Sequence, residues 1–447
     1  MESILQITNT SSYFSLNFSI RFKNNKILEQ LNTVLFKEVI FCCRKNVLIR
    51  KYCKEAVKFG DVSLNVLQSP RHIVVILNPS ANNRNLHYVY SNAKKEYEKY
   101  CAPLLHLSGA YVSLLTTNEE TNAINLTNKI PNTANAIIIA GGDGTVSEVV
   151  TGLLRRKKDG SLQEMLPIGI LPVGKTNSLA NYLYHNANVF KNHTSDLYRY
   201  RIMLEATFSV IKEITNNINV MEIKNVENDN NENELKPVYA VNRLHIGSFR
   251  DASVKTDKYW YFNKLRSYAF YLFGSYNQNN PINAELKYTP PCSGCSKCYK
   301  NRMDIIKNNN IKNTRWWHVF VPEFRKTADY KQVFKNYENI ENPFCDQVNE
   351  MSIKSVELSI SSKVINGTPS LRINIGPENL NYTSFVKEGW RRIKDKSNAE
   401  NQSVQQIDAQ MFHLSPQNKN ETVNNYIMLF NKCPLSKITF FSYDFSS

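Results

Sequence analysis

The chain has 447 residues, enough for more than one domain with a hydrophobic core of its own. A hydrophobic content of 42% and a charged content of 21% are typical of a globular protein and exclude an intrinsically disordered one. A formal charge of +16 suits phosphate ligands and a membrane surface, and without an arginine-rich run with interleaved aromatics we expect no nucleic-acid partner.

Residues 1–68 are predicted to form a targeting and membrane-surface segment. Residues 1–30 contain two acids, Glu2 and Glu29, among basic residues and serines, a composition that leans toward mitochondrial targeting. Residues 33–53 are apolar but interrupted by charges, so they lack the 18 or more apolar residues of a membrane span. We expect an amphipathic helix that lies on a bilayer or on the protein's own core.

The next segment, residues 69–205, is predicted to alternate strands and helices. Strands are expected at 72–79, 111–117, 136–140 and 167–174, and helical stretches at 87–109, 119–129 and 146–156. Such alternation is typical of a Rossmann-like parallel α/β domain, which binds ligands at the carboxyl ends of its strands.

Residues 206–447 change to short alternating segments typical of antiparallel strands. These lie at 218–223, 238–247, 316–324, 354–362 and 372–377, with a closing pair at 405–410 and 437–444. They predict a β-sandwich domain with mobile loops near 225–236, which is rich in Asn, and near 286–315.

The nine cysteines are an odd number without the spacing of a secreted disulfide framework. Cys292, Cys295 and Cys298 follow one another at three-residue steps, and His318 is a candidate fourth ligand for a zinc ion. A cysteine-rich surface loop is the alternative. The segment contains no strand end and no phosphate motif, so it is expected to be dispensable for catalysis.

The stretch NAIIIAGGDGTVSEVV, residues 135–150, carries a clear chemical signal. A β-branched strand leads into a turn that places one acid, Asp143, among three glycines, and valines then return at helical spacing. Turn N–H groups and a helix N-terminus both favour an anion, so this order predicts a phosphate site. An ordinary βα turn is the alternative, although an acid among three glycines is expected to cap little and to pack against nothing.

The other predicted strands also end in polar residues. The four ends are Asn78-Pro79, Thr116-Thr117, Gly141 to Thr145, and Gly174 to Ser178. They offer amides, hydroxyls, glycines and one carboxylate, without a histidine or cysteine nucleophile. This set suits nucleotide binding and phosphoryl transfer, in which positioning and charge neutralisation dominate, better than covalent hydrolysis.

Three sequential blocks resemble the diacylglycerol kinase catalytic domain that ceramide and sphingosine kinases share. They are LNP at 77–79, GGDGTVSEVVTGLLRR at 141–156 and PIGILPVGKTNSLAN at 167–181. Two further stretches, APLLHLSGAYVSLL at 102–115 and GSFRDASVKTDKYWY at 247–261, resemble the mitochondrial acylglycerol kinases in particular.

The resemblance implies an ATP- and magnesium-dependent lipid kinase that phosphorylates monoacylglycerol and diacylglycerol to lysophosphatidic and phosphatidic acid, with ceramide as a further candidate substrate. It also implies a place on the mitochondrial inner membrane facing the intermembrane space, and partnership with the carrier translocase of that membrane.

The resemblance further implies roles for matching residues. Asp143 would orient magnesium or accept the proton of the substrate hydroxyl, Asp408 would be a second catalytic acid reaching back to the nucleotide, and Asp251 would face the lipid head group. The nucleotide-binding set would be Asn78, Thr117, Gly141, Gly142, Gly144, Thr145, Gly174, Lys175, Asn177 and Arg266, with Lys258 as a further candidate.

For two of these residues, Asp251 and Thr117, the sequence also allows a simpler structural role. Asp251 could pair with Arg250 or Lys255 on the surface, and Thr117 could be a helix N-cap.

Two positions depart from the family pattern. Lys175 stands where relatives carry Thr or another small residue, and Gln410 replaces the second acid of an Asp-x-Glu element that begins at Asp408. These departures leave room for an alternative function, a mainly non-catalytic import subunit with attenuated kinase activity. A relative of NAD kinase, which shares GGDGT, is a third candidate that the match at 247–261 argues against.

Overall fold

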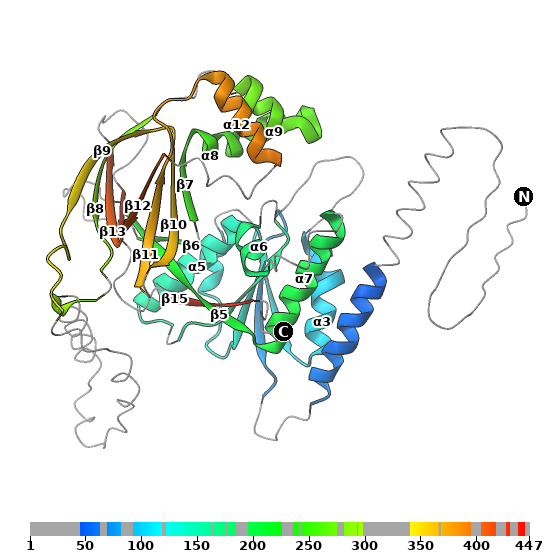
Figure 1. Ribbon diagram of the computed structural model, residues 1–447. Coiled ribbons are helices and arrows are strands. Elements are labelled where there is room, and N and C mark those ends of the chain that lie inside the picture. Colours follow the sequence, from blue (N-terminus) through cyan, green and yellow to red (C-terminus); the bar gives the residue numbers. More distant parts are fainter. Residues whose placement is uncertain are drawn as a thin grey trace, which may run out of the picture.

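The protein is described by a computed structural model (Figure 1). It describes residues 45–62, 69–81, 93–118, 122–162, 164–174, 177–184, 195–225, 236–241, 243–274, 281–292, 294–297, 340–365, 368–394, 404–416, 426–429 and 437–442.

Four parallel strands form the first half of the fold and confirm the α/β prediction. Their order is β2 (Tyr111–Thr116), β1 (His72–Leu77), β3 (Ala136–Gly141) and β4 (Ile168–Pro172). Every residue of β3 and β4 is buried. Such complete burial is why these strands are continuous apolar runs rather than alternating ones.

Helices cover both faces of this parallel sheet (Figure 1). One group contains α2 (Ala93–Glu96), η1 (Tyr97–Cys101), α3 (Ala102–Leu107), α6 (Ser178–Tyr184) and α7 (Ser195–Lys212), and the other contains α4 (Asn122–Thr127) and α5 (Asp143–Lys158). The start of α5 differs from the predicted Val146. Gly142 is extended (φ −93°, ψ −178°) and is the N-cap, so Asp143 is already the first helical residue.

A helix over residues 45–60 contains the described part of the predicted amphipathic segment. Its Tyr52 and Ala56 are buried in the core of the first half of the fold. The Tyr52 ring meets the Phe208 ring of α7 edge-on, with centroids 5.6 Å apart. Of the two predicted locations, this part of the helix therefore lies on the protein's own core. Among the described residues, none of the helices combines the length and apolarity needed to cross a membrane.

Antiparallel strands form the second half and pack as two sheets. The larger sheet continues through β15 (Lys437–Phe441), β5 (Thr215–Asn225), β14 (Tyr426–Leu429), β13 (Met411–Pro416), β8 (Ile282–Thr289) and β9 (Asn349–Ser355), and β6 (Val238–Val241) pairs with β5. The smaller sheet has the order β12 (Gln405–Ala409), β11 (Thr368–Ile375), β10 (Glu357–Ile365) and β7 (Arg243–Gly247). Apolar residues of both sheets share one core, as predicted for a β-sandwich.

Several predicted strands are placed differently in the structure. The prediction grouped β15 with the sandwich, but Phe440 of β15 pairs in parallel with Ile168 of β4, and β15 also runs antiparallel to β5. One continuous sheet of 11 strands therefore joins both halves of the fold. The proposed boundary at residue 205 falls within α7.

Two further predictions need revision. The single strand predicted at 238–247 is two strands, β6 and β7, which belong to different sheets. The loop predicted from residue 286 starts later, because β8 continues to Thr289. The strand predicted at 316–324 lies outside the described residues.

A group of helices lies over β7 and β10, and we call it the helical cap (Figure 1). It contains α8 (Ser248–Lys255), η2 (Thr256–Leu265), α9 (Arg266–Ala269), η3 (Phe270–Gly274) and α12 (Tyr382–Lys394). Phe249 of α8 stacks on Phe385 of α12, with ring centroids 4.5 Å apart. Arg392 of α12 donates two hydrogen bonds of 2.7 Å to Glu357 of β10 and lies 3.9 Å from the centre of the Phe249 ring. The helical cap is thus held on the smaller sheet by aromatic packing and ion pairs.

Candidate functional site

The carboxyl ends of the four parallel strands lie side by side, as predicted. Leu77 of β1 is level with Thr116 of β2 and Ala140 of β3, and Gly141 is level with Pro172 of β4. The residues that follow these strands therefore meet at one edge of the sheet, which we call the strand-end site.

A hydrogen bond between the Asn78 and Thr145 side chains stabilises this edge of the sheet. The Asn78 side-chain N–H donates to the Thr145 hydroxyl at 2.9 Å, and the Asn78 side-chain oxygen accepts from the backbone N–H of Ser80 at 3.0 Å. Thr145 is 6% exposed and packs under Gly141, where an added Cβ would meet its side chain at 2.7 Å. Thr145 therefore joins β1 to α5 from within, rather than standing in the open face of the turn.

Two glycine turns touch each other at the strand-end site. A Cβ on Gly174 would meet the Cα of Gly142 at 2.4 Å, so only glycine permits this approach. Asn177 fixes the second turn: its side-chain oxygen accepts from Gly174 N–H at 2.9 Å, and its side-chain N–H donates to the carbonyls of Gly174 and Pro172. Asn177 has a φ of 50°, a left-handed conformation that Asn tolerates better than most residues. The Asn177 side chain is occupied in holding its own turn.

Gly144 has a different environment from the other glycines. It is exposed in the first turn of α5, and a Cβ added there would meet nothing within 4 Å. Its φ is not positive, and neither are those of Gly141 and Gly142. Among the described residues, neither a contact nor an unusual backbone angle therefore requires glycine at position 144. The open space above it, at the N-terminus of a 16-residue helix, is where an anion would be favoured.

Asp143 is more constrained than the sequence predicted. Its carboxylate oxygens accept hydrogen bonds from the backbone N–H groups of Ser178 at 3.0 Å and Leu179 at 3.3 Å. The expectation that this acid caps little was wrong, because it caps the N-terminus of α6 from a position 35 residues away. These bonds hold the half-buried carboxylate beside the open space at Gly144. It is the one carboxylate of the strand-end site within the described residues, enough for an Mg²⁺ that takes its remaining ligands from phosphates.

Thr117 follows β2 and is 3% exposed. Its backbone N–H donates to the Leu77 carbonyl at 2.9 Å, which extends the pairing of β1 and β2 by one residue. The following helix, α4, begins at Asn122, so Thr117 does not occupy its N-cap. Its predicted place beside the nucleotide stays a prediction.

Other predicted residues are on elements outside the parallel sheet. Asp408 is on β12 of the smaller sheet and forms a two-pronged pair with Arg372 of β11, at 2.7 Å and 3.0 Å. Asp251 is on α8, 3.7 Å from Arg250, so the surface pairing considered from the sequence is present. Arg266 begins α9 and Lys258 lies in η2, both in the helical cap.

The structure thus brings together eight of the predicted residues. They are Asn78, Thr117, Gly141, Gly142, Asp143, Gly144, Thr145 and Gly174, with Asn177 supporting them. Asp408, Asp251, Arg266 and Lys258 are on β12 and in the helical cap, so their predicted roles stay predictions, and Lys175 lies outside the described residues. The sequence did not predict that the backbone N–H groups of Ser178 and Leu179 bind Asp143. Almost every residue has a backbone N–H group, so residue type does not mark such donors.

Two models of known protein families match this chain, one after the other. The family model for the diacylglycerol kinase catalytic domain matches residues 72–223, which contain the strand-end site, and the model for the acylglycerol kinase C-terminal region matches residues 241–426.

Mitochondrial acylglycerol kinases are similar over most of the chain. The one from Xenopus laevis is 31% identical over 355 residues, which cover 78% of this chain and 74% of that protein. The one from Pongo abelii is 36% identical over 361 residues, covering 78% and 76%. The one from Mus musculus is 36% identical over 247 residues, covering 55% and 53%. On these matches, the chain belongs to the acylglycerol kinase family of lipid kinases.

Proposed function

We propose that this protein transfers the γ-phosphoryl group of ATP to a hydroxyl of monoacylglycerol or diacylglycerol, yielding lysophosphatidic or phosphatidic acid. The observation that carries the proposal is the pairing of an open space at Gly144 with the fixed carboxylate of Asp143, at the N-terminus of α5. A phosphate fits the first feature, and a hydroxyl that must lose a proton fits the second.

The protein's own groups would divide the work as follows. The first N–H groups of α5 have no helical carbonyl to bond and would hold phosphate oxygens. ATP would supply the phosphoryl group, and Mg²⁺ held in part by Asp143 would neutralise its charge. Alternatively, Asp143 would accept the proton of the acceptor hydroxyl. The ion pair with Arg372 occupies Asp408, so Asp143 is the stronger candidate for this role.

The helical cap supports a lipid substrate and a membrane surface as partner. Six exposed apolar side chains lie on it, and we call them the apolar patch: Tyr261, Phe262, Leu265, Leu272, Phe273 and Trp390. The rings of Phe262 and Phe273 stack, with centroids 6.0 Å apart, so side chains from separate helices form one surface. An exposed apolar patch of this kind marks a lipid or partner interface.

An open groove of about 510 Å³ adjoins the apolar patch. Leu272, Val386 and Trp390 line it, with the basic residues Lys387 and Arg391 beside them. Apolar side chains beside cations suit an acyl chain next to the anionic head group of a membrane lipid or of the phosphorylated product, since the acylglycerol substrates are uncharged. Asp251 lies on α8 of the same helical cap. We therefore retain the proposal that Asp251 faces the lipid head group.

The relatives are named mitochondrial, which supports a place in the mitochondrion. A place on the inner membrane facing the intermembrane space is part of the proposal that rests on the sequence resemblance. Partnership with the carrier translocase is the second function that the sequence resemblance implies. A catalytically inactive variant separates the two functions. Asp143→Asn and Gly142→Glu both act at the strand-end site, so either variant is expected to co-purify with the translocase as wild type does.

The proposal is tested on the purified chain with Mg²⁺ and labelled ATP. Monoacylglycerol, diacylglycerol, ceramide and NAD are offered in turn, the lipids in mixed micelles. We expect label in lysophosphatidic and phosphatidic acid. Phosphorylation of NAD with none of the lipids would place the chain with the NAD kinases, and transfer to none of the four acceptors would favour the non-catalytic import subunit.

A further inference from the structure

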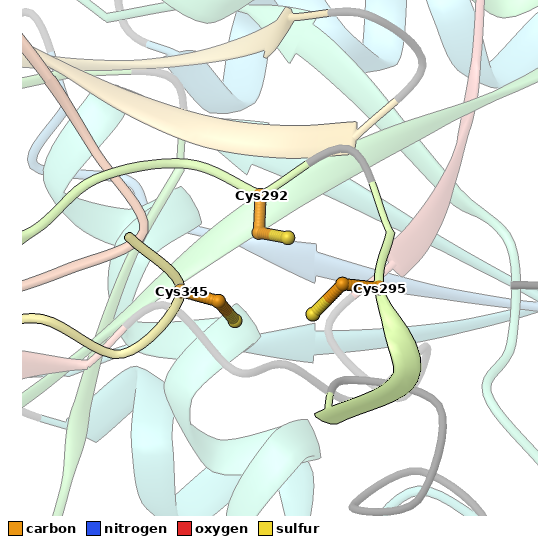
Figure 2. Close-up of side chains that lie close together, drawn as sticks. All are labelled: Cys292, Cys295 and Cys345. Carbon is orange, nitrogen blue, oxygen red and sulfur yellow. The ribbon is translucent and has the colours of Figure 1, made fainter. Parts of the chain in front are cut away.

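Three cysteines meet at one end of the sandwich, which we call the cysteine cluster (Figure 2). Cys292 and Cys295 follow β8, and Cys345 precedes β9. Their three sulfur atoms lie within 4.8 Å of one another, and the residues are 4%, 0% and 4% exposed. Figure 2 shows the three side chains directed toward a common point. For Cys292 and Cys295, burial rules out the exposed surface loop considered from the sequence.

The cysteine cluster is separate from the larger hydrophobic cores of the described residues. Cysteine is a small apolar residue that is often buried within a larger core. Here, among the described residues, the three cysteines form a buried group of their own, separate from the core of the α/β half, from that of the sandwich and from that of the helical cap. The group contains no aliphatic or aromatic side chain. Three thiols gathered in one place, with their sulfur atoms within 4.8 Å of one another, are an arrangement that suits a thiolate-bound metal ion.

The backbone around the cluster is shaped to aim the sulfurs. Gly294, between Cys292 and Cys295, has a φ of 130°, which favours glycine. The Ser296 N–H donates to the Ile340 carbonyl at 2.9 Å, so the two chain segments are tied together next to the cysteines. The side-chain N–H of Asn342 donates to the Cys292 sulfur at 3.4 Å. Hydrogen bonds of this kind to a ligand atom commonly surround metal sites in proteins.

We propose that Cys292, Cys295 and Cys345 bind one Zn²⁺ as thiolates in a structural site. Zinc prefers tetrahedral sulfur ligands at about 2.3 Å, which sets neighbouring sulfurs about 3.8 Å apart, inside the observed limit. Each thiol releases its proton to solvent when the ion binds, and no sulfur changes oxidation state. A disulfide would use two sulfurs and leave the third without a role.

The position of the site indicates its purpose. β8 and β9 pair along their whole length, from Ile282 with Ser355 to Tyr288 with Asn349, and β9 is the edge strand of the large sheet. About 60 residues connect the two strands, and closing so long a loop has an unfavourable entropy. An ion held by Cys292 and Cys295 on one side and Cys345 on the other fixes the two ends of this connection. The zinc would therefore stabilise the edge of the sandwich.

The test measures the metal on the full chain, expressed without a histidine tag and purified in reductant. We expect about one zinc per chain by mass spectrometry. Replacement of the zinc by Co²⁺ is expected to give a thiolate-to-metal absorption with the intensity of three or four thiolates. Cys345→Ser and Cys292→Ser are expected to lose the metal and to unfold at a lower temperature, whereas the matched control Cys53→Ser retains it.

Two results on the wild-type chain would overturn the proposal even if the variants failed to fold. One is a folded chain with no zinc and no thiolate absorption after incubation with Co²⁺. The other is an absorption of two thiolates or fewer together with a disulfide found by thiol titration under denaturing conditions. Metal content that persists in both Cys292→Ser and Cys345→Ser would overturn it as well.

Discussion

The Asp143 carboxylate accepts a hydrogen bond from the Ser178 backbone N–H at 3.0 Å, so the acid of the GGDGT turn caps the helix that follows the next strand. This bond links the ends of β3 and β4, together with the contact between Gly142 and Gly174. The catalytic candidate is thereby fixed by backbone groups, which do not vary with side-chain rotamers. A carboxylate oriented in this way suits a reaction in which positioning does most of the work.

Gly144→Ala is expected to separate folding from nucleotide binding. An added Cβ meets no atom of the described residues within 4 Å, and alanine is the better helix former, so stability is expected to hold or to rise by up to about 1 kcal/mol. The same Cβ would occupy the space assigned to phosphate, so the KM for ATP is expected to rise severalfold. Thermal unfolding and ATP titration of the kinase rate measure the two effects. An unchanged KM for ATP would remove the phosphates from this space.

Gly174→Ala is the matched variant with the opposite expectation. Its Cβ would lie 2.4 Å from the Gly142 Cα and 2.8 Å from the Asn177 side-chain oxygen, so the two turns must separate. Overpacking of this kind costs about 1–3 kcal/mol. Denaturant unfolding is expected to show that loss, together with a fall in activity. Wild-type stability in this variant would contradict the close contact of the two turns.

Glu388 on α12 is expected to make the stability of the helical cap depend on pH in the acid range. Burial raises the pKa of its carboxyl, but hydrogen bonds from Arg391 and Arg392 outweigh burial and leave the pKa below its usual range. A carboxyl with a lowered folded-state pKa adds stability above its unfolded-state pKa, and this addition is lost as the pH falls through the folded-state pKa. The stabilisation is therefore present near neutral pH and lost in acid.

Glu388→Gln is accordingly expected to lower the free energy of unfolding near pH 7 by about 1–3 kcal/mol. It should also weaken the decline in stability below about pH 5 that the wild type shows. Urea unfolding over a series of pH values measures both effects. Glu350→Gln, which breaks an exposed pair with Lys287, is the control and is expected to change little. Identical pH profiles for Glu388→Gln and wild type would show that this carboxyl does not carry the acid dependence.

The apolar patch is expected to hold the protein on anionic membranes. Leu265 and Phe273 are 61% and 58% exposed, so Leu265→Asn and Phe273→Asn remove contact area without disturbing a core. Each is expected to weaken binding to vesicles that contain phosphatidic acid severalfold in a sedimentation assay. Val364→Asn, equally exposed at 63% but on β10, serves as the control. Equal binding by all three variants would assign the patch to something other than a membrane.

The parallel strands and their shared edge could be predicted from the sequence because fully buried strands are continuous apolar runs. Ala136–Gly141 and Ile168–Pro172 are of this kind, and a glycine follows each within two residues, at positions 142 and 174. The pairing of β15 with β4 could not be predicted in the same way. Strand character is local, whereas the choice of partner for Lys437–Phe441 depends on contacts with residues far away in the chain.

The functional residues show the same contrast: local sequence pattern predicts which residues matter, but it does not predict their distant contacts. Residue type pointed to Asp143 and the glycines, since few other roles suit them in a βα turn. It did not reveal that Ser178 holds Asp143, or that Cys345 joins Cys292 and Cys295 across about 50 residues, because a lone cysteine has no spacing to interpret. Cys298 and His318, the other zinc ligands considered from the sequence, lie outside the described residues.

The most direct measurement is the turnover of diacylglycerol phosphorylation with Mg²⁺ and ATP for wild type, Asp143→Asn and Asp159→Asn. Asn at position 143 retains an oxygen that can cap α6, so a stability loss of about 1 kcal/mol or less is expected, while the loss of charge should reduce turnover by orders of magnitude. Asp159→Asn makes the same change at the opposite end of α5 and is expected to retain wild-type turnover. Turnover of folded Asp143→Asn within a few-fold of wild type would contradict the assignment of Asp143 as the central residue of the site.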